Sequence, residues 1–402
     1  ERESLHPDTT SLYQTINGFD LDISYKHPLD DKSKIELGYD GKINDNAENM
    51  VFQMPGGFSD TSYSGNNTFG YNRAIHGIWL EYDYKFNEKF SIKPSIRYEY
   101  VIKDISFKSE NNMVEILDLM QIEYPSNIYS RVLYSLGDST YTYADNYSTV
   151  YPDLHFTYNL TKKQSIQFGL SKRVNRPGSG GHGHGSRQIR PFPRDIYSDN
   201  FIFVGNPFLK PEYSTQYDLS YKSPLPMGFA YINLYYHQLK NVIEWYDDDE
   251  FEGGDVLTFK NADSGENMGV ELFTMIMGQT FGGGYNLSKL NDPSGDYELN
   301  GNSQMINFYS RINLPEKYIK YLLAPCLHLP FDFEFGCYYM KMTVPGGNLF
   351  GSKGALWANM GISKGFFDKS LEISLGIDNL LDRGGFEMKR TKPLINSDEN
   401  IY

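Results

Sequence analysis

The stretch Leu371–Asp378 reads LEISLGID and alternates apolar and polar residues without a break. Its apolar members are Leu371, Ile373, Leu375 and Ile377, and between them stand Glu372, Ser374, Gly376 and Asp378. Successive side chains of a β-strand point to opposite faces, so a strand here has one apolar face and one polar face. Such a strand suits a wall that has lipid on one side and water on the other.

The same alternation recurs along most of the chain. Ile166, Phe168 and Leu170 alternate with small or polar residues in the same way. The apolar sets that begin at Ile166 and Leu371 are therefore expected to face lipid, and Gln167, Glu372 and Asp378 to face the lumen. We predict strands at 13–27, 33–45, 72–86, 89–107, 148–160, 164–177, 212–225, 228–246, 255–277, 279–292, 302–314, 331–343, 354–366 and 370–382.

Composition fits a membrane barrel although it resembles that of a soluble protein. Charged residues make up 22% of the 402 residues, and no run approaches the roughly 18 apolar residues of a membrane-spanning helix. The chain has 33 Tyr and 26 Phe, and aromatic side chains gather where lipid meets water. The sequence predicts one all-β domain over 1–402, a transmembrane antiparallel β-barrel with about 14 strands. The alternative is a large soluble β-sandwich or propeller.

The connections between these strands alternate in length. Short turns follow the odd-numbered strands except the eleventh, after which 315–330 is longer, and the long segments 46–71, 108–147 and 178–211 follow even-numbered ones. Outer-membrane barrels have short periplasmic turns and long extracellular loops, so the long segments are expected outside the cell. By this alternation the first strand begins outside and the last ends outside. We therefore expect the chain to be a portion of a larger barrel.

Charge and motifs narrow the function. The net charge of −14 argues against a nucleic-acid partner. The chain contains neither an HExxH motif nor a phosphate-binding P-loop, and its one GxSxG match, Gly361–Gly365, falls inside a predicted strand, so we predict neither an enzyme nor a cofactor. Lys93, Arg97 and Glu99 share the lumen-facing parity, and we expect them to neutralise one another or to pair with a plug.

One glycine-rich segment and the residues after it carry the candidate metal-binding and ligand-binding side chains. His182 and His184 alternate with glycines and form a weak candidate site for a transition metal; the alternative is a flexible loop without metal. Three arginines follow and are interleaved with aromatic residues. They could hold an anionic ligand or pair with acids of the lumen. The candidate ligand-binding set is Arg187, Arg190, Arg194, Phe192 and Tyr197.

The segment 205–212 reads GNPFLKPE and resembles the GNPxLxPE signature of TonB-dependent outer-membrane receptors. The matching residues are Gly205, Asn206, Pro207, Leu209, Pro211 and Glu212. Three further segments resemble the family in the same order: 171–177 (SKRVNRP), 267–272 (NMGVEL) and 378–383 (DNLLDR). The signature is a structural motif, since its prolines withhold backbone donors where a strand ladder begins.

The resemblance implies a multi-pass barrel of the cell outer membrane with about 22 strands, closed by a plug domain. It implies import of a scarce ligand, with the TonB system acting through a plug that, like the terminal strand, is expected outside this chain. Outer-membrane lipid, and a surface lipoprotein or other outer-membrane subunits, are the expected partners. Two alternatives are a structural barrel subunit of an outer-membrane complex that has lost transport, and a passive porin.

Overall fold

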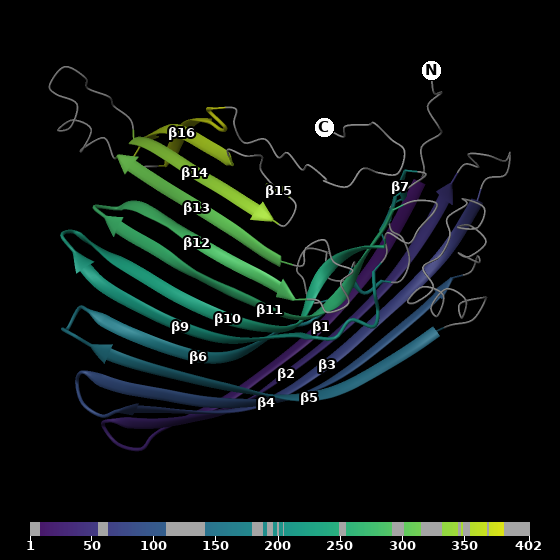
Figure 1. Cartoon of the computed structure of the whole chain (residues 1–402), viewed down its shortest axis with the longest axis horizontal. Coiled ribbons are helices and arrows are strands. Elements are labelled where there is room, and N and C mark those ends of the chain that lie inside the picture. The colour runs from purple at the N-terminus through teal and green to yellow at the C-terminus, as the bar shows by residue number, and fades with distance from the viewer. Residues whose placement is uncertain are drawn as a thin grey trace.

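The computed structural model describes most of the chain as one curved sheet (Figure 1). None of the described residues forms a helix long and apolar enough to cross a membrane. The described residues are 9–54, 63–109, 141–178, 188–190, 196–198, 201–203, 205–248, 255–291, 301–314, 332–344, 347–348, 354–367 and 370–381.

Fourteen of the described strands pair side by side in chain order, each antiparallel to the next. They are β1 (Thr9–Pro28), β2 (Ser33–Met54), β3 (Tyr63–Lys85), β4 (Phe90–Ser109), β5 (Tyr141–Asn159), β6 (Ser165–Asn175), β9 (Glu212–Leu225), β10 (Gly228–Asp248), β11 (Asp255–Ile276), β12 (Gln279–Asn291), β13 (Gly301–Leu314), β14 (Asp332–Val344), β16 (Ala355–Phe366) and β17 (Leu371–Ile377). Three short pieces, β7 (Ile196–Ser198), β8 (Phe201–Phe203) and β15 (Gly347–Asn348), join this sheet locally.

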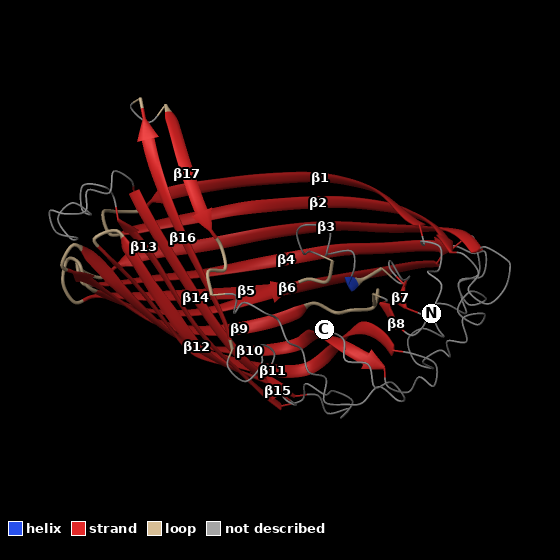
Figure 2. Ribbon diagram, turned by 90° about the horizontal axis from the view of Figure 1, so that it is seen from above, coloured by secondary structure: helices blue, strands red, loops and turns tan. Residues whose placement is uncertain are grey.

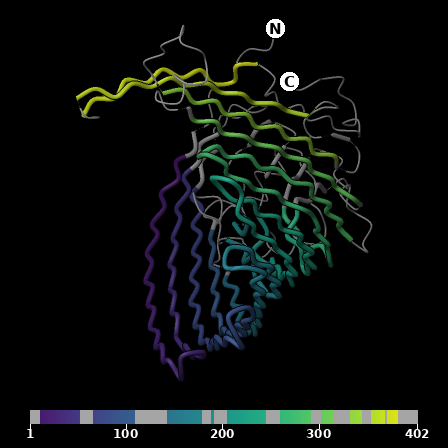
Figure 3. The backbone as a smooth tube through the Cα atoms, turned by 90° about the vertical axis from the view of Figure 1, so that its left-hand side faces the viewer, coloured from purple at the N-terminus to yellow at the C-terminus, as the bar shows by residue number. Residues whose placement is uncertain are grey.

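The sheet curls into an open wall with a hollow inner side (Figure 3). Seen from above, the strands run across this wall as one continuous layer (Figure 2). Among the described residues, β1 is paired in register with β2 and β17 with β16, and no register joins β1 to β17. Each of these two strands therefore has one edge outside the described ladder.

The two faces of the wall follow from the register. One row across β1 to β5 consists of apolar and aromatic side chains that are exposed, except for the half-buried Tyr39, and the row one residue further along the strands faces the hollow side, where Trp79 is half-buried and Tyr151 is buried. The outward row consists of Ile23, Tyr39, Ile78, Tyr98 and Val150. The inward row consists of Ser24, Gly38, Trp79, Arg97 and Tyr151. The predicted period-two alternation is confirmed.

The predicted lipid face of the segment after Ser165 is confirmed by its neighbours. Phe168 is paired with Phe156 on one side and with Leu219 on the other. Phe168 and Leu219 expose 37% and 45% of their surface, although both are large and apolar. Exposed apolar side chains in a continuous band are stable only against lipid or another apolar surface.

Short polar turns join the strands at one end of the wall. The Asp30 carboxylate accepts hydrogen bonds from the Lys32 amide at 2.8 Å and from the Ser33 hydroxyl at 2.9 Å. These donors hold the pKa of Asp30 below its ordinary value. Asn87 and Thr161 cap their turns in the same way, accepting from the amides of Phe90 and Gln164. These turns lie where the sequence predicted short connections.

Two predicted loops are shorter than expected. The segment 46–71 was predicted as a loop, but β2 continues to Met54 and β3 already begins at Tyr63. Similarly, β5 begins at Tyr141, within the predicted loop 108–147. The ladder continues beyond the lipid because antiparallel backbone pairing needs no apolar alternation in water.

The outward face predicts a test of membrane insertion. Leu219 lies six residues from Leu225, at the short-turn end of β9. A strand needs ten or so residues to cross the hydrocarbon, so Leu219 lies near its middle. Leu219→Arg is expected to lower the free energy of unfolding from lipid vesicles by about 2 to 4 kcal/mol, because the charge meets hydrocarbon. Gln167→Arg, on the lumen face of the next strand, is expected to change it by less than about 0.5 kcal/mol. Equal losses in urea titrations of both variants would contradict the assignment of the faces.

Candidate functional site

A network of charged side chains covers the inner face of β2 to β6. The Arg97 guanidinium pairs with Asp40, and its Nε donates to Glu99 at 2.7 Å. Glu99 also pairs with Arg176, which follows the end of β6. Lys93 pairs with Glu81 at 2.8 Å. The prediction that these residues neutralise one another is confirmed for Arg97 and Glu99, whereas Lys93 pairs with Glu81 instead.

Two glycines make room for this network. A β-carbon on Gly77 would collide with the guanidinium of Arg97, so only glycine lets Arg97 cross β3 to reach Asp40. A β-carbon on Gly38 would collide with the Trp79 ring at 2.6 Å. The close approach of large side chains to bare backbone explains glycine within these strands.

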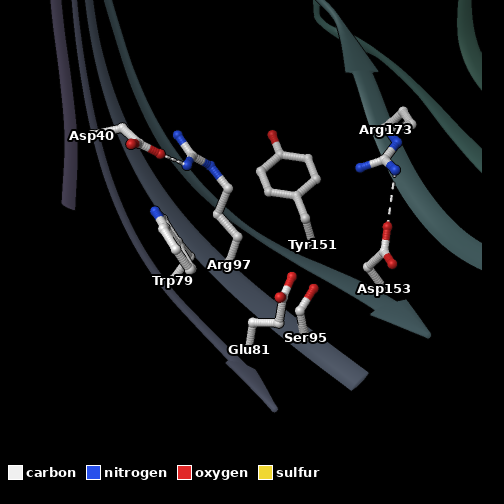
Figure 4. Close-up of a pocket in the computed structure, with 8 residues that line it drawn as sticks. All are labelled: Asp40, Trp79, Glu81, Ser95, Arg97, Tyr151, Asp153 and Arg173. Carbon is white, nitrogen blue, oxygen red and sulfur yellow. Dashed lines mark hydrogen bonds and ion pairs between the residues drawn. The ribbon is translucent and has the colours of Figure 1, made fainter. Parts of the chain in front are cut away.

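The charged side chains border a recess of about 380 Å³ on the inner wall. In Figure 4, Tyr151 stands between two arginines, each of which is held by an aspartate. Arg173 donates to Asp153 at 2.9 Å, and His155 lies 2.7 Å from the other oxygen of that carboxylate. The lining residues are Asp40, Trp79, Glu81, Ser95, Arg97, Tyr151, Asp153 and Arg173. The recess therefore offers both signs of charge and two aromatic side chains, Trp79 and Tyr151.

The segment that follows β6 folds inward and packs on the upper part of the same wall. Ile189 is 1% exposed, as are Ile105 and Phe107 on β4. The Tyr71 hydroxyl donates to the carbonyl of Pro177 at 3.3 Å. Large apolar side chains thus face inward here, where the segment covers them.

A buried ion pair fixes this inward segment. Arg190 Nη1 lies 2.7 Å from Glu48 Oε2, and the two side chains are 3% and 1% exposed. Removing two charges from water costs free energy that only close pairing offsets. If one partner were lost, the other would remain as an uncompensated buried charge. The pair therefore holds residues 188–190 at a fixed position against β2.

The 205–212 motif holds the other side of the inward segment. The amides of Gly205 and Asn206 donate to the carbonyls of Arg190 and Gln188 at 2.9 and 2.7 Å. The Asn206 amide group donates to the Phe259 carbonyl at 3.1 Å, and its oxygen accepts from the Phe208 amide at 2.9 Å. The motif thus connects the inward segment to β11.

The rest of the motif is equally fixed. Leu209 is 1% exposed, and Pro207 is fully buried. The Glu212 carboxylate accepts from the Ile243 amide at 2.9 Å on β10. Lys210 exchanges two hydrogen bonds with the Asn261 side chain, at 2.8 and 3.0 Å. These contacts attach the motif to β10 and β11.

Of the predicted ligand-binding residues, the structure describes Arg190 and the strand that contains Tyr197. Arg190 pairs with the acid Glu48, so it takes the second of the two predicted roles. Tyr197 lies in β7. The side chains of His182, His184, Arg187, Phe192 and Arg194 lie outside the described residues. Within the described part of the chain, no three His, Cys, Asp or Glu side chains gather into a metal site.

The sequence did not reveal the acid that pairs with Arg190, nor several of the residues that line the recess. Glu48 fell within a predicted loop, and the recess residues Tyr151, Asp153 and Arg173 were not predicted as site residues. Their lumen-facing parity was readable, since Asp153 and Tyr151 alternate with Pro152 and Leu154. Parity alone does not tell which inward side chains meet across strands.

A family model described as the outer membrane protein beta-barrel family matches residues 3–402. The chain belongs to this family. It is therefore an outer-membrane barrel protein, in agreement with the apolar outward face and the polar inner face. A search of curated protein sequences finds no match.

Solved structures are similar to this chain at low identity, and the first of them shows the same fold. The ferric yersiniabactin uptake receptor FyuA from Yersinia pestis is 12% identical with a TM-score of 0.58, over 97% of this chain and 52% of that one. The ferric-catecholate import receptor Fiu from E. coli K12 is 12% identical with a TM-score of 0.48, over 92% and 60%. The siderophore receptor PirA from Pseudomonas aeruginosa is 11% identical with a TM-score of 0.42, over 94% and 69%. These neighbours are transport receptors, and the chain spans about half the length of FyuA.

The buried ion pair predicts how the inward segment opens. Arg190→Ala leaves Glu48 buried without its partner, so we expect the segment to lose about 3 to 5 kcal/mol of local stability. Hydrogen exchange at the amides of Gly205 and Asn206, which bond to the segment, measures this opening. Arg173→Ala is the control, because the Arg173 side chain is 56% exposed and its pair with Asp153 contributes at most about 1 kcal/mol. Unchanged exchange in Arg190→Ala would refute the anchoring role.

Proposed function

We propose that this chain forms part of the barrel of an outer-membrane receptor that imports a scarce ligand with energy from the TonB system. The observation that carries the proposal is the inner wall. A charged recess and an inward-folded segment lie on the polar face of a barrel in this family. An importer needs such a wall to meet both a ligand and a plug.

The size of the sheet supports a larger barrel. Within the described residues, β1 and β17 are each paired on one side. Each unsatisfied backbone group in hydrocarbon costs several kcal/mol, so both edges need partner strands. A receptor barrel of about 22 strands with a plugged lumen supplies them. On this proposal the plug and the contact with TonB belong to parts of the protein outside residues 1–402.

The inner wall also fits a receptor better than an enzyme. Arg97 and Arg173, the two arginines of the recess, are already paired with carboxylates, which favours fixed contacts with a plug or a polar ligand over acid–base chemistry. We therefore propose that the protein has no catalytic activity. A surface lipoprotein or another outer-membrane subunit would bind at the end of the wall opposite the short turns.

The proposal predicts energy-dependent uptake. Cells that lack the complete gene are expected to accumulate less of one radiolabelled ligand among ferric siderophores, haem and copper, and a protonophore should abolish the difference. In cells with the gene, Arg173→Ala is expected to reduce this uptake, because Arg173 lines the recess. Arg311→Ala, which breaks an exposed pair with Glu334 outside the recess, is the control.

Two outcomes would contradict import. Steady conductance of the purified protein in planar bilayers, without an energy source, would indicate a passive porin. Unchanged uptake of every ligand class in the deletion strain would favour a structural barrel, and pull-down from that membrane would then identify its complex.

A further inference from the structure

The neighbouring strands β5 and β6 are paired over only part of their length. The ladder between β5 and β6 ends at the pair Asp153–Ser171. Beyond that pair, β5 continues along β4 as far as Tyr141, and β6 continues along β9 as far as Glu212. We call the gap between β5 and β6 beyond Asp153–Ser171 the seam.

Side chains bridge the seam without closing it. The Tyr213 hydroxyl on β9 lies 3.0 Å from the Thr149 hydroxyl on β5. The Lys172 ammonium lies 5.1 Å from the centre of the Tyr213 ring and 5.9 Å from that of Tyr151. An ammonium over aromatic faces is attracted to the ring electrons, so Lys172 is held at the seam.

A cavity of about 620 Å³ lies at this seam. Its lining is rich in hydroxyl, amide and ammonium groups and contains no carboxylate. The lining residues are Ser148, Thr149, Val150, Lys172, Tyr213, Thr215, Gln238, Leu239, Lys240 and Asn241. A concave site with two cations, four hydroxyls and no acid is chemically suited to an anion.

The cavity opens on the outward face of the wall. Val150 is 43% exposed and continues the apolar row of Ile78 and Tyr98. Lys172 shares the parity of Phe168 on β6, and Gln238 and Lys240 share that of Leu234 on β10. An anion in this cavity would therefore sit outside the barrel, beside the membrane.

The depth of the cavity matches the polar headgroups. On β10, Lys240 lies twelve residues from Gly228 at the short-turn end, slightly more than the 9 to 11 or so that cross the hydrocarbon. Directly below the cavity, Tyr217 and Tyr236 are paired on the outward face with ring centres 6.1 Å apart. Aromatic pairs of this kind form the girdle where lipid tails meet headgroups.

We propose that the seam cavity binds the phosphorylated sugar headgroup of an outer-leaflet glycolipid, lipopolysaccharide. Lys172 and Lys240 neutralise the phosphate, the hydroxyls of Ser148 and Thr215 bond the phosphate or the sugar, and the acyl chains lie against the apolar face below. Basic pockets at the edge of the hydrocarbon recognise lipid headgroups in this way. Bound glycolipid would also cover the seam, where the wall lacks its ladder.

The test uses the full-length protein, purified and stripped of lipid by detergent exchange. Native mass spectrometry counts the copies of added lipopolysaccharide that remain bound. The dephosphorylated glycolipid is expected to bind about tenfold more weakly than the phosphorylated one, since charge-assisted hydrogen bonds are lost. Lys172→Gln/Lys240→Gln should lower affinity for the phosphorylated form by a similar factor and leave the dephosphorylated form unaffected.

Two further variants separate binding from damage to the seam. Lys240→Gln alone keeps Lys172 over its aromatic rings and is still expected to weaken binding. Lys162→Gln/Lys163→Gln, in the exposed turn at the other end of β6, is the matched control and should bind normally. Equal affinity of the Lys172/Lys240 double variant and the unmodified protein would overturn the proposal. Displacement of the glycolipid by millimolar inorganic phosphate would also overturn it and indicate a site for free phosphate.

Discussion

Backbone hydrogen bonding in hydrocarbon is the constraint on which this structure depends. A strand in lipid has no water to bond its amides and carbonyls, so each must find a partner on a neighbouring strand. The ladder that runs from β1 to β17 meets this need for fourteen strands in succession. Once each strand lies in the ladder, its side chains must alternate between lipid and lumen. The apolar outward rows and the charged inner wall are consequences of the ladder.

The architecture changes where the ladder between β5 and β6 ends. Beyond Asp153–Ser171 the wall divides, and residues 176–178 and 188–190 lie on the inner side of β2 to β4. Side chains such as the hydroxyls of Thr149 and Tyr213 bridge the divided wall in place of backbone pairing. The inward segment is held instead by specific contacts: Arg190 with Glu48, and the amides of Gly205 and Asn206 with the carbonyls of the segment. The 205–212 motif is therefore an anchor between an inward loop and the strand β9 that follows it.

The strands could be predicted because period two is a local property. Leu371–Ile377 and Ser165–Leu170 show it within six or seven residues, and the structure places both in strands with the predicted faces. The ends of β2 and β3 could not be predicted, since their outer parts, such as Asn44–Asn49, carry no apolar alternation to mark them as paired. Residue type suggested two roles for Arg190, and its partner lies 142 residues earlier, in a segment predicted as a loop. The recess around Tyr151 needs five strands, β2 to β6, in register, which depends on contacts that no single segment encodes.

The central claim is that successive residues of each strand alternate between lipid and lumen, and that the row containing Leu219 faces lipid. Spin labels placed in turn at every position of β9 (Glu212–Leu225), with the protein in lipid vesicles, test it directly. Oxygen, which concentrates in hydrocarbon, should relax labels most at Tyr217, Leu219 and Tyr221. A water-soluble nickel chelate should relax them most at Gln216 and Asp218, which face the lumen. A reversed phase, or accessibility without a period of two, would contradict the account.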